Sequence, residues 1–368
     1  MIVHETLKRT PLFDIHVSLK AKMVPFGGWE MPLQYADAGI LAEYESTRRK
    51  VAVFDTSHMG EFLVEGDAQK SGLDRIVTQA VKDMPVKTCR YGACLNEQGG
   101  VIDDLIVFRI KEDKWFIVVN GATTAKDAAH FMKHITAPGK FKDISSQIGK
   151  LDVQGPLSRD VLKPLIKGIE RLEYYTFDEF DVLGEKVIVS RTGYTGELGY
   201  EIYFPWNKIS ELWREIFKDK RVKPAGLGAR DVLRLEMGYS LYGHELLENI
   251  APLEAGLKKF VDFKKDFIGK EILVEQEKRG IPRKLVAFRA ENRRSPRAEQ
   301  KIFSTDSQEI GIVTSGTFSP ALTRGIGLGF VAGEYAQVGK KILVGDQKDT
   351  IPAEITARPF YENGTLKN

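Results

Sequence analysis

The segment from Val101 to Phe108 is apolar on both sides of a predicted strand. Side chains alternate across a strand, which gives two faces: Ile102, Asp104, Ile106 and Phe108, and Val101, Asp103, Leu105 and Val107. Each face carries one acid, and an ionised carboxylate removed from water must be paired or neutralised. Two interpretations follow. Both aspartates cap backbone amides in water at the mouth of a hairpin, or at least one is held in a cleft to meet a cationic or proton-bearing ligand.

Similar patterns predict the other elements of the first 280 residues. Apolar runs predict strands at 51–55, 115–119 and 150–156. Helical periodicity predicts helices at 68–79, at 125–135 and at 209–217. The inward stripes are Ala125, Ala128, Ala129, Met132 and Ile135 in the second helix and Ile209, Leu212, Trp213, Ile216 and Phe217 in the third. Short turns between strands favour mixed or antiparallel sheets in an α+β fold over a doubly wound parallel sheet.

Helical periodicity ends after Gly280-Ile281-Pro282, just beyond a predicted helix at 270–279. Short strands take over, at 285–289, 300–303, 309–313, 325–331, 342–344 and 353–355. This pattern predicts a small all-β unit, a barrel or a sandwich. We therefore expect an α+β core over residues 1–280, with an undetermined internal boundary, and a C-terminal β-barrel domain over residues 281–368.

Length and charge narrow the class of protein. A chain of 368 residues suggests two or three domains, and 29% charged with 42% hydrophobic residues is ordinary for a globular protein. The net charge of +3 implies neither nucleic-acid nor membrane binding, although Arg48-Arg49-Lys50 is a local basic run. Residues 1–10 lack the apolar core of a signal peptide, and no run reaches the ~18 residues of a membrane helix. We expect a cytoplasmic protein.

The cysteine and histidine patterns do not predict a metal site. Cys89 and Cys94 match no common zinc or redox spacing and are expected to be reduced thiols. Six histidines are scattered without an H-E-x-x-H pattern. His58 is interpreted as an interior histidine.

Three stretches are candidates for chemistry. The first is the Asp103-Asp104 strand, with Tyr91 just upstream across a hairpin. The second is 190–204, a strand, a glycine-rich turn and a returning strand in which Glu201 and Tyr203 share a face. In the third, 224–237, glycines lead into a helix whose free amides, with Arg230, would hold an anion. The alternative for Arg230 is a salt bridge to Asp231 or to a neighbouring helix. Together these residues suit a flat, polar heteroaromatic ligand with a carboxylated tail.

Five motifs resemble the aminomethyltransferase family of the glycine cleavage system, the T-protein. They are Phe54–Glu61, Asn96–Asp104, Ser190–Glu197, Gly226–Arg230 and Pro359–Tyr361. The resemblance extends from Lys8 to the final strands. It implies a three-lobed fold with tetrahydrofolate in a central channel and no metal. It also implies a monomer that takes an aminomethyl group from the lipoyl arm of the H-protein, passes the methylene carbon to tetrahydrofolate and releases ammonia.

The resemblance also implies roles for particular residues. The family's catalytic aspartate corresponds to Asp104. Its folate contacts correspond to Tyr91, Ile106, Tyr174, Tyr194, Glu201 and Arg230, with a further contact near the C-terminus at Tyr361. Two departures fall on the expected channel rim: Leu198 stands where relatives commonly carry an acid, and Ile250-Ala251-Pro252 replaces an asparagine-proline turn.

Three other functions compete with this one. Folate-dependent demethylases of methylated amines or sulfonium compounds share the fold and would keep the folate pocket. A folate-binding relative that serves iron–sulfur assembly carries a K-G-C-Y-x-G-Q motif, but Lys265–Lys270 has no cysteine here, which argues against it. A structural or nucleic-acid-binding module would need a basic stripe that the sequence lacks.

Overall fold

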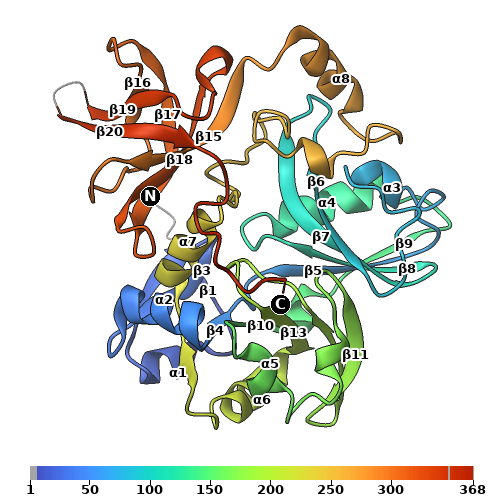
Figure 1. The fold of residues 1–368 in the computed structure, drawn as a ribbon. Helices are drawn as coiled ribbons and strands as arrows, with labels where there is room; N and C mark the ends of the chain where they lie inside the picture. The colour runs from blue at the N-terminus through green and yellow to red at the C-terminus, as the bar shows by residue number, and fades with distance from the viewer. Residues whose placement is uncertain (1–5, 347–348, 368) are drawn as a thin grey trace.

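The computed structural model describes residues 6–346 and 349–367. Within these residues the chain forms three open sheets and one closed barrel. Figure 1 shows them as three lobes, with the barrel at the upper left, a five-stranded sheet at the upper right and a six-stranded sheet below. None of the described helices is long and apolar enough to cross a membrane.

The lower lobe is built on the six-stranded sheet, whose order is β11-β12-β13-β10-β4-β14. Its strands are β4 (Val51–Asp55), β10 (Ile148–Gln154), β11 (Phe177–Val182), β12 (Glu185–Ser190), β13 (Gly199–Pro205) and β14 (Val222–Pro224). The helices of this lobe are α1 (Phe13–Ser18), α2 (Gly39–Arg49), α5 (Ser158–Leu162), α6 (Ile209–Ile216) and α7 (Leu227–Glu236). A small sheet of β1 (Lys8–Arg9), β2 (Ala21–Phe26) and β3 (Trp29–Tyr35) precedes them. The predicted stripe of α6 is confirmed, since Ile209, Leu212, Trp213 and Ile216 are buried.

The five-stranded sheet has the order β6-β7-β8-β5-β9. Its strands are β5 (Gly60–Glu65), β6 (Cys89–Leu95), β7 (Val101–Lys111), β8 (Lys114–Val119) and β9 (Lys140–Asp143), and its helices are α3 (Leu73–Ile76) and α4 (Thr124–His134). The chain enters this sheet from β4 and returns from β9 to β10, so the two sheets are interlocked. An aromatic layer joins them, in which the Phe116 and Tyr203 ring centroids lie 5.0 Å apart. One face of β7 therefore looks toward the six-stranded sheet.

Two predicted helices need correction. The helix expected at 68–79 is only α3, because Gly72 adopts φ +86° and Val77 pairs with Cys94 as a β-bridge. The helix expected at 125–135 is α4, but its buried residues are Asp127, Ala128 and Phe131. Met132, predicted to face inward, is 62% exposed. The inward stripe of α4 thus differs from the one that the apolar residues predicted, and it includes an acid.

The C-terminal strands close into a barrel, as predicted, in the order β15-β18-β17-β16-β19-β20. The strands are β15 (Arg283–Ala290), β16 (Lys301–Phe303), β17 (Glu309–Ser319), β18 (Arg324–Ala332), β19 (Lys341–Asp346) and β20 (Asp349–Thr356), and α8 (Lys270–Arg279) precedes them. Short 3-10 turns occur at Ser145–Gln147, Ile169–Arg171, Trp206–Lys208, Lys258–Phe260 and Gly333–Tyr335. Among the described strands, pairing is antiparallel except for β1 with β3 and β14 with β4. The predicted α+β class with mixed and antiparallel sheets is confirmed.

After β20 the chain runs back to the lower lobe (Figure 1). The Phe360 and Tyr361 amides donate to the Glu236 carbonyl at the end of α7. The Thr365 amide and hydroxyl donate to Glu197 Oε2 at 2.9 and 2.6 Å. The segment 360–366 therefore ties the barrel to the six-stranded sheet.

Candidate active site

Asp104 is half-buried on β7, on the strand face that looks toward the six-stranded sheet. Its Oδ2 accepts a hydrogen bond from the Tyr91 hydroxyl at 2.8 Å, and its Oδ1 accepts one from Asn120 Nδ2 at 2.9 Å. Burial, followed by the charge of Asp103, raises the pKa of Asp104 to about 7. Asp104 is therefore a carboxyl group that gains or loses its proton near neutral pH, as acid–base catalysis requires.

Asp103 lies on the opposite face of β7 and is fully buried. Its Oδ2 accepts from the Asn120 amide at 2.9 Å and its Oδ1 from Asn120 Nδ2 at 2.8 Å. Burial, followed by the charge of Asp127, raises its pKa well above the ordinary range. The first interpretation of the aspartate pair is thus wrong: Asp103 does cap a backbone amide, but away from water.

Asn120 is a site residue that the sequence did not reveal. It follows β8 and precedes α4, and its Nδ2 contacts Asp103 Oδ1, Asp104 Oδ1 and, at 3.2 Å, the Asp104 carbonyl. The available signal was an amide residue between an apolar strand and a helix start. Asparagine at such a place is commonly a turn residue, so the signal was weak.

Strand register places Tyr91, Ile106, Val118 and Glu61 side by side across β6, β7, β8 and β5. Two of the predicted folate contacts, Tyr91 and Ile106, are thus neighbours on the face that carries Asp104. Glu61, at the other end of this row, is fully buried, and neither carboxyl oxygen has a hydrogen-bond partner among the described residues. Burial raises the pKa of Glu61 well above its ordinary value.

The six-stranded sheet contributes a buried ion-pair network. Lys150 Nζ lies 3.1 Å from Asp152 Oδ1 and 3.3 Å from Glu201 Oε1. Glu201 is only 5% exposed, and its Oε2 accepts from the Tyr203 hydroxyl at 3.0 Å. Burial alone would lower the pKa of Lys150, but Asp152 and Glu201 raise it. The network therefore keeps Lys150 charged between its two acids.

Arg230, on α7, joins the same network through Asp152. Its NH1 lies 2.8 Å from Asp152 Oδ2. The alternative partner, Asp231, instead pairs with Arg234 at 2.8 Å. Burial would raise the pKa of Asp152, but Lys150 and Arg230 lower it. Arg230 is thus a fixed cation beside the site, and the predicted Asp231 salt bridge is wrong.

The glycines at the start of α7, where an anion site is predicted, lie close to neighbouring elements. The Gly226 amide donates to Glu43 Oε2 at 2.9 Å. A Cβ at Gly228 would come within 2.6 Å of Ile40 Cδ1. These glycines therefore allow α7 to pack closely, and the amide of the N-cap residue Gly226 already has a carboxylate partner.

Two predicted folate contacts, Tyr194 and Tyr174, both lie near Tyr239. The Tyr194 ring lies 5.1 Å from the Arg230 guanidinium and is stacked on Tyr239 at 5.5 Å. Its hydroxyl donates to the Ser240 carbonyl. Burial has the largest effect on the Tyr194 hydroxyl and raises its pKa. The charge of Arg234 lowers this pKa, and the charge of Asp104 raises it. Tyr194 is therefore close enough to Asp104 for the two groups to interact electrostatically. Burial, followed by the neighbouring Tyr239, raises the pKa of Tyr174.

Tyr361 lies in a different cluster from the other predicted site residues. The Arg48 guanidinium lies 4.0 Å from the centre of its ring. Arg48 in turn bridges Glu197 at 2.8 Å and Glu236 at 2.7 Å, and all three are buried. In this structure Tyr361 covers an ion-pair cluster at the base of the C-terminal segment.

His58 and the two cysteines, Cys89 and Cys94, are buried. His58 is 7% exposed, as expected of an interior residue, and burial lowers its pKa to about 4. Its Nδ1 has no hydrogen-bond partner among the described residues. Cys89 and Cys94 are free and buried. Residues 6–346 and 349–367 contain no group of three or more metal-ligating side chains.

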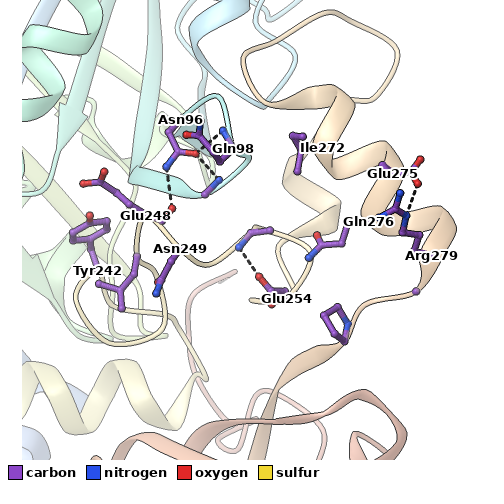
Figure 2. Close-up of a pocket in the computed structure, with 15 residues that line it drawn as sticks. Asn96, Gln98, Tyr242, Glu248, Asn249, Glu254, Ile272, Glu275, Gln276 and Arg279 are labelled. Carbon is purple, nitrogen blue, oxygen red and sulfur yellow. Dashed lines mark hydrogen bonds and ion pairs between the residues drawn. The ribbon is translucent and has the colours of Figure 1, made fainter.

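A large cavity lies between the β6–β7 turn, the segment 242–254 and α8 (Figure 2). Its volume is about 1270 Å³. Figure 2 shows Asn96, Glu248 and Tyr242 on one side and Ile272, Gln276 and Arg279 on the other. The Tyr242 hydroxyl accepts from Lys126 Nζ at 2.7 Å. The cavity is lined by none of the predicted site residues.

Comparison with known proteins gives the family. Residues 12–265 match the GCVT N-terminal domain, and residues 283–362 match the glycine cleavage T-protein C-terminal barrel domain. This chain belongs to the glycine cleavage T-protein family. An aminomethyltransferase of Pseudothermotoga lettingae is 42% identical over 98% of this chain and 100% of its own length. One from Listeria monocytogenes is 41% identical over 97% of this chain and 98% of its own.

A solved structure supports the T-protein fold. The glycine cleavage system aminomethyltransferase T from Bartonella henselae superposes with a TM-score of 0.91 at 30% identity, covering 98% of this chain and 99% of that one. The predicted three-lobed T-protein fold is therefore confirmed. The chain is an aminomethyltransferase of the T-protein family, and Asp104 is on the face of β7 that looks toward the six-stranded sheet.

Proposed function

We propose that this chain transfers the methylene carbon of an aminomethyl group, carried on the lipoyl arm of a partner H-protein, to tetrahydrofolate and releases ammonia. The observation that carries the proposal is Asp104, half-buried and fixed by Tyr91 and Asn120 on a sheet face opposite Lys150 and Glu201. The family of aminomethyltransferases to which the chain belongs supports the same reaction.

The donor set fits tetrahydrofolate. Its pterin ring carries N–H groups that a buried carboxylate accepts, and Glu201 supplies such a carboxylate. Tyr91, Tyr174, Tyr194 and Ile106 offer apolar and aromatic surface for the ring. Arg230 supplies a cation for an acidic group of the ligand, in competition with its Asp152 partner. Tyr361 is proposed as a contact at the outer end of the ligand.

Asp104 is the proposed catalytic residue. Tetrahydrofolate supplies the nitrogen that accepts the methylene carbon, and positive charge develops there as ammonia leaves. An ionised Asp104 beside that nitrogen stabilises the charge, because the Tyr91 and Asn120 donors hold the carboxylate in place before the reaction. Its pKa of about 7 also allows it to take up or return a proton at neutral pH.

The test is ammonia release from aminomethylated H-protein, measured with and without tetrahydrofolate. We expect release that depends on both components. Folate binding without ammonia release, combined with activity on a methylated amine or sulfonium donor, would instead assign the chain to the folate-dependent demethylases. Sedimentation of the enzyme alone and with H-protein tests the further proposal that a monomer binds this partner.

A further inference from the structure

The C-terminal segment, residues 360–366, follows the barrel and lies against the lower lobe (Figure 1). It forms neither helix nor strand, and the proposed mechanism uses only its Tyr361. Its other end bonds, through Thr365 and Leu366, to the turn 195–198 that leads into β13. This turn directly follows Tyr194, so the C-terminal segment contacts the stretch of chain that carries a proposed folate contact.

Thr365 makes most of these bonds. Its amide and its hydroxyl donate to Glu197 Oε2 at 2.9 and 2.6 Å, and its hydroxyl oxygen accepts from the Leu198 amide at 2.9 Å. The Leu366 amide adds a bond to the Gly196 carbonyl at 3.2 Å. One threonine side chain therefore binds both a side chain and the backbone of the turn.

Glu197 connects this contact to the rest of the lower lobe. It is only 1% exposed, and its Oε1 accepts from Arg48 NH1 at 2.8 Å. The same NH1 group donates to the Thr195 carbonyl at 2.7 Å, and the Thr195 hydroxyl donates to Gln154 Oε1 at 2.9 Å. A buried carboxylate is costly when a partner is removed. The turn is therefore held by α2, by β10 and by the C-terminal segment together.

Tyr194 depends on this turn for its position. Its backbone continues into Thr195, and its ring lies 5.1 Å from the Arg230 guanidinium and stacks on Tyr239. A side chain that contacts a ligand must be held to within roughly 0.5 Å by the residues behind it. We propose that Thr365 is a positioning residue for Tyr194: by binding Glu197 and the Leu198 amide, it holds the turn and keeps the Tyr194 ring in place for folate. The role of Tyr194 rests on the proposed function, whereas the hold on the turn does not.

Leu198 fixes the far end of the same turn. Its side chain belongs to the hydrophobic core of the lower lobe, and not to the channel rim where the sequence placed it. Its carbonyl accepts from the Gly155 amide at 2.8 Å and from the Ser158 hydroxyl at 3.0 Å. Loss of the Thr365 contacts is therefore expected to loosen residues 194–197 without unfolding the lobe.

The test compares Thr365→Val with Thr365→Ser. Valine keeps the branched shape but removes the hydroxyl, whereas serine keeps the hydroxyl. We expect Thr365→Val to weaken tetrahydrofolate binding roughly 5- to 20-fold, with kcat at saturating tetrahydrofolate within about 2-fold of the wild type. We expect Thr365→Ser to bind like the wild type. Normal affinity in Thr365→Val would overturn the proposal, as would weak binding in Thr365→Ser or an equal loss of kcat and affinity.

Gly364→Ala displaces the C-terminal segment in a second way. A Cβ at Gly364 would collide with the Gly196 carbonyl oxygen, so alanine must push the segment off the turn while every polar group of Thr365 remains. We expect the same direction of change in affinity as in Thr365→Val. Asn363→Ala, at an exposed position of the same segment, is the matched control and is expected to leave affinity unchanged. Normal affinity in Gly364→Ala would contradict the proposal.

Hydrogen exchange tests the same link without an activity assay. Mass spectrometry of the peptide that covers residues 194–198 measures the exchange of its amides. We expect exchange to slow roughly 5-fold when tetrahydrofolate saturates the wild-type enzyme, and to become faster by a similar factor in ligand-free Thr365→Val. In an enzyme that binds tetrahydrofolate, unchanged exchange in either comparison would overturn the proposal. If Thr365→Val exchanges faster but the wild type releases no ammonia from aminomethylated H-protein, the proposed function fails while the hold on the turn stands.

Discussion

The side-chain nitrogen of Asn120 lies 2.9 Å from Asp104 Oδ1 and at the same time 2.8 Å from Asp103 Oδ1. One amide group therefore orients two adjacent acids that point to opposite faces of β7. The acid toward the six-stranded sheet is free to act on a ligand, and the other is enclosed in the lobe. Because the two aspartates point to opposite faces of β7, only Asp104 is proposed as a catalytic group.

Replacing Asp104 by asparagine tests the catalytic assignment. The amide keeps the shape of the side chain but removes the charge that stabilises the developing cation. We expect turnover to fall by roughly 10²–10⁴-fold while folate affinity stays within a few-fold. Ammonia release and folate fluorescence titration measure the two quantities. Asp113→Asn, in the exposed turn between β7 and β8, is the control, and near-normal turnover of Asp104→Asn would refute the role.

The pH dependence of kcat/KM follows from the raised pKa of Asp104, about 7. Below that pH the carboxyl holds its proton and cannot stabilise positive charge, so kcat/KM falls as pH decreases and levels off as pH rises above it. The apparent pKa belongs to the coupled group of Asp103, Asp104 and Asp127. Initial rates between about pH 5.5 and 9 measure it. A profile that stays flat down to the ordinary aspartate range would contradict the shift.

Glu201→Gln tests recognition of the pterin ring. A neutral amide loses a charge-assisted hydrogen bond and leaves Lys150 with Asp152 as its carboxylate partner. We expect folate affinity to fall roughly 10- to 100-fold, with a smaller effect on kcat. Glu185→Gln, which removes the half-buried partner of Lys208, is the matched control. Unchanged folate affinity in Glu201→Gln would place the pterin elsewhere.

Lys150→Met tests the ion-pair network as a source of stability. Lys150 is 1% exposed and is shared by two buried carboxylates. Its removal leaves uncompensated charge, and we expect the free energy of unfolding to fall by roughly 3–5 kcal/mol. Lys208→Met, at a pair in which the lysine side chain is 44% exposed, is expected to cost at most about 1 kcal/mol. Urea denaturation measures the free energy of unfolding of both variants. An equal decrease in the two variants would show that the buried network stabilises the fold no more than the exposed pair does.

Phe131→Ala and Met132→Ala test which face of α4 is buried. Phe131 is fully buried and packs against Phe62 and Phe141, whereas Met132 is 62% exposed. We expect the first change to cost about 3–5 kcal/mol and the second less than about 0.5 kcal/mol. Thermal or urea unfolding measures both. The reverse order would restore the stripe predicted from sequence.

The sequence predicted those parts of the fold that depend on local patterns. All six barrel strands and the helices at 209–216 and 270–279 follow from short-range periodicity. The interlocking of the two sheets could not be predicted this way, because β4 pairs with β10 and not with its successor β5. The helix expected at 68–79 was wrong because tertiary pairing at Val77 and a left-handed Gly72 overrode the pattern.

In the candidate site, too, contacts between residues close in the sequence could be predicted, whereas contacts between distant residues could not. Asp104 and Tyr91 belong to one hairpin, so their hydrogen bond was within reach of sequence analysis. Arg230 and Asp152 are 78 residues apart, and nothing local indicated their pairing. The burial of Asp127 was missed because amphipathic analysis assigns acids to the solvent side of a helix.

The segment 360–366 follows the barrel in the chain but is bound to Glu197 and Glu236 of the lower lobe. During translation, the lower lobe and the barrel leave the ribosome before this clasp exists. The barrel can already contact α7 through Ser315 and Ser319, which bond to Arg234 and Glu236, so the clasp closes last, on lobes that are already in contact.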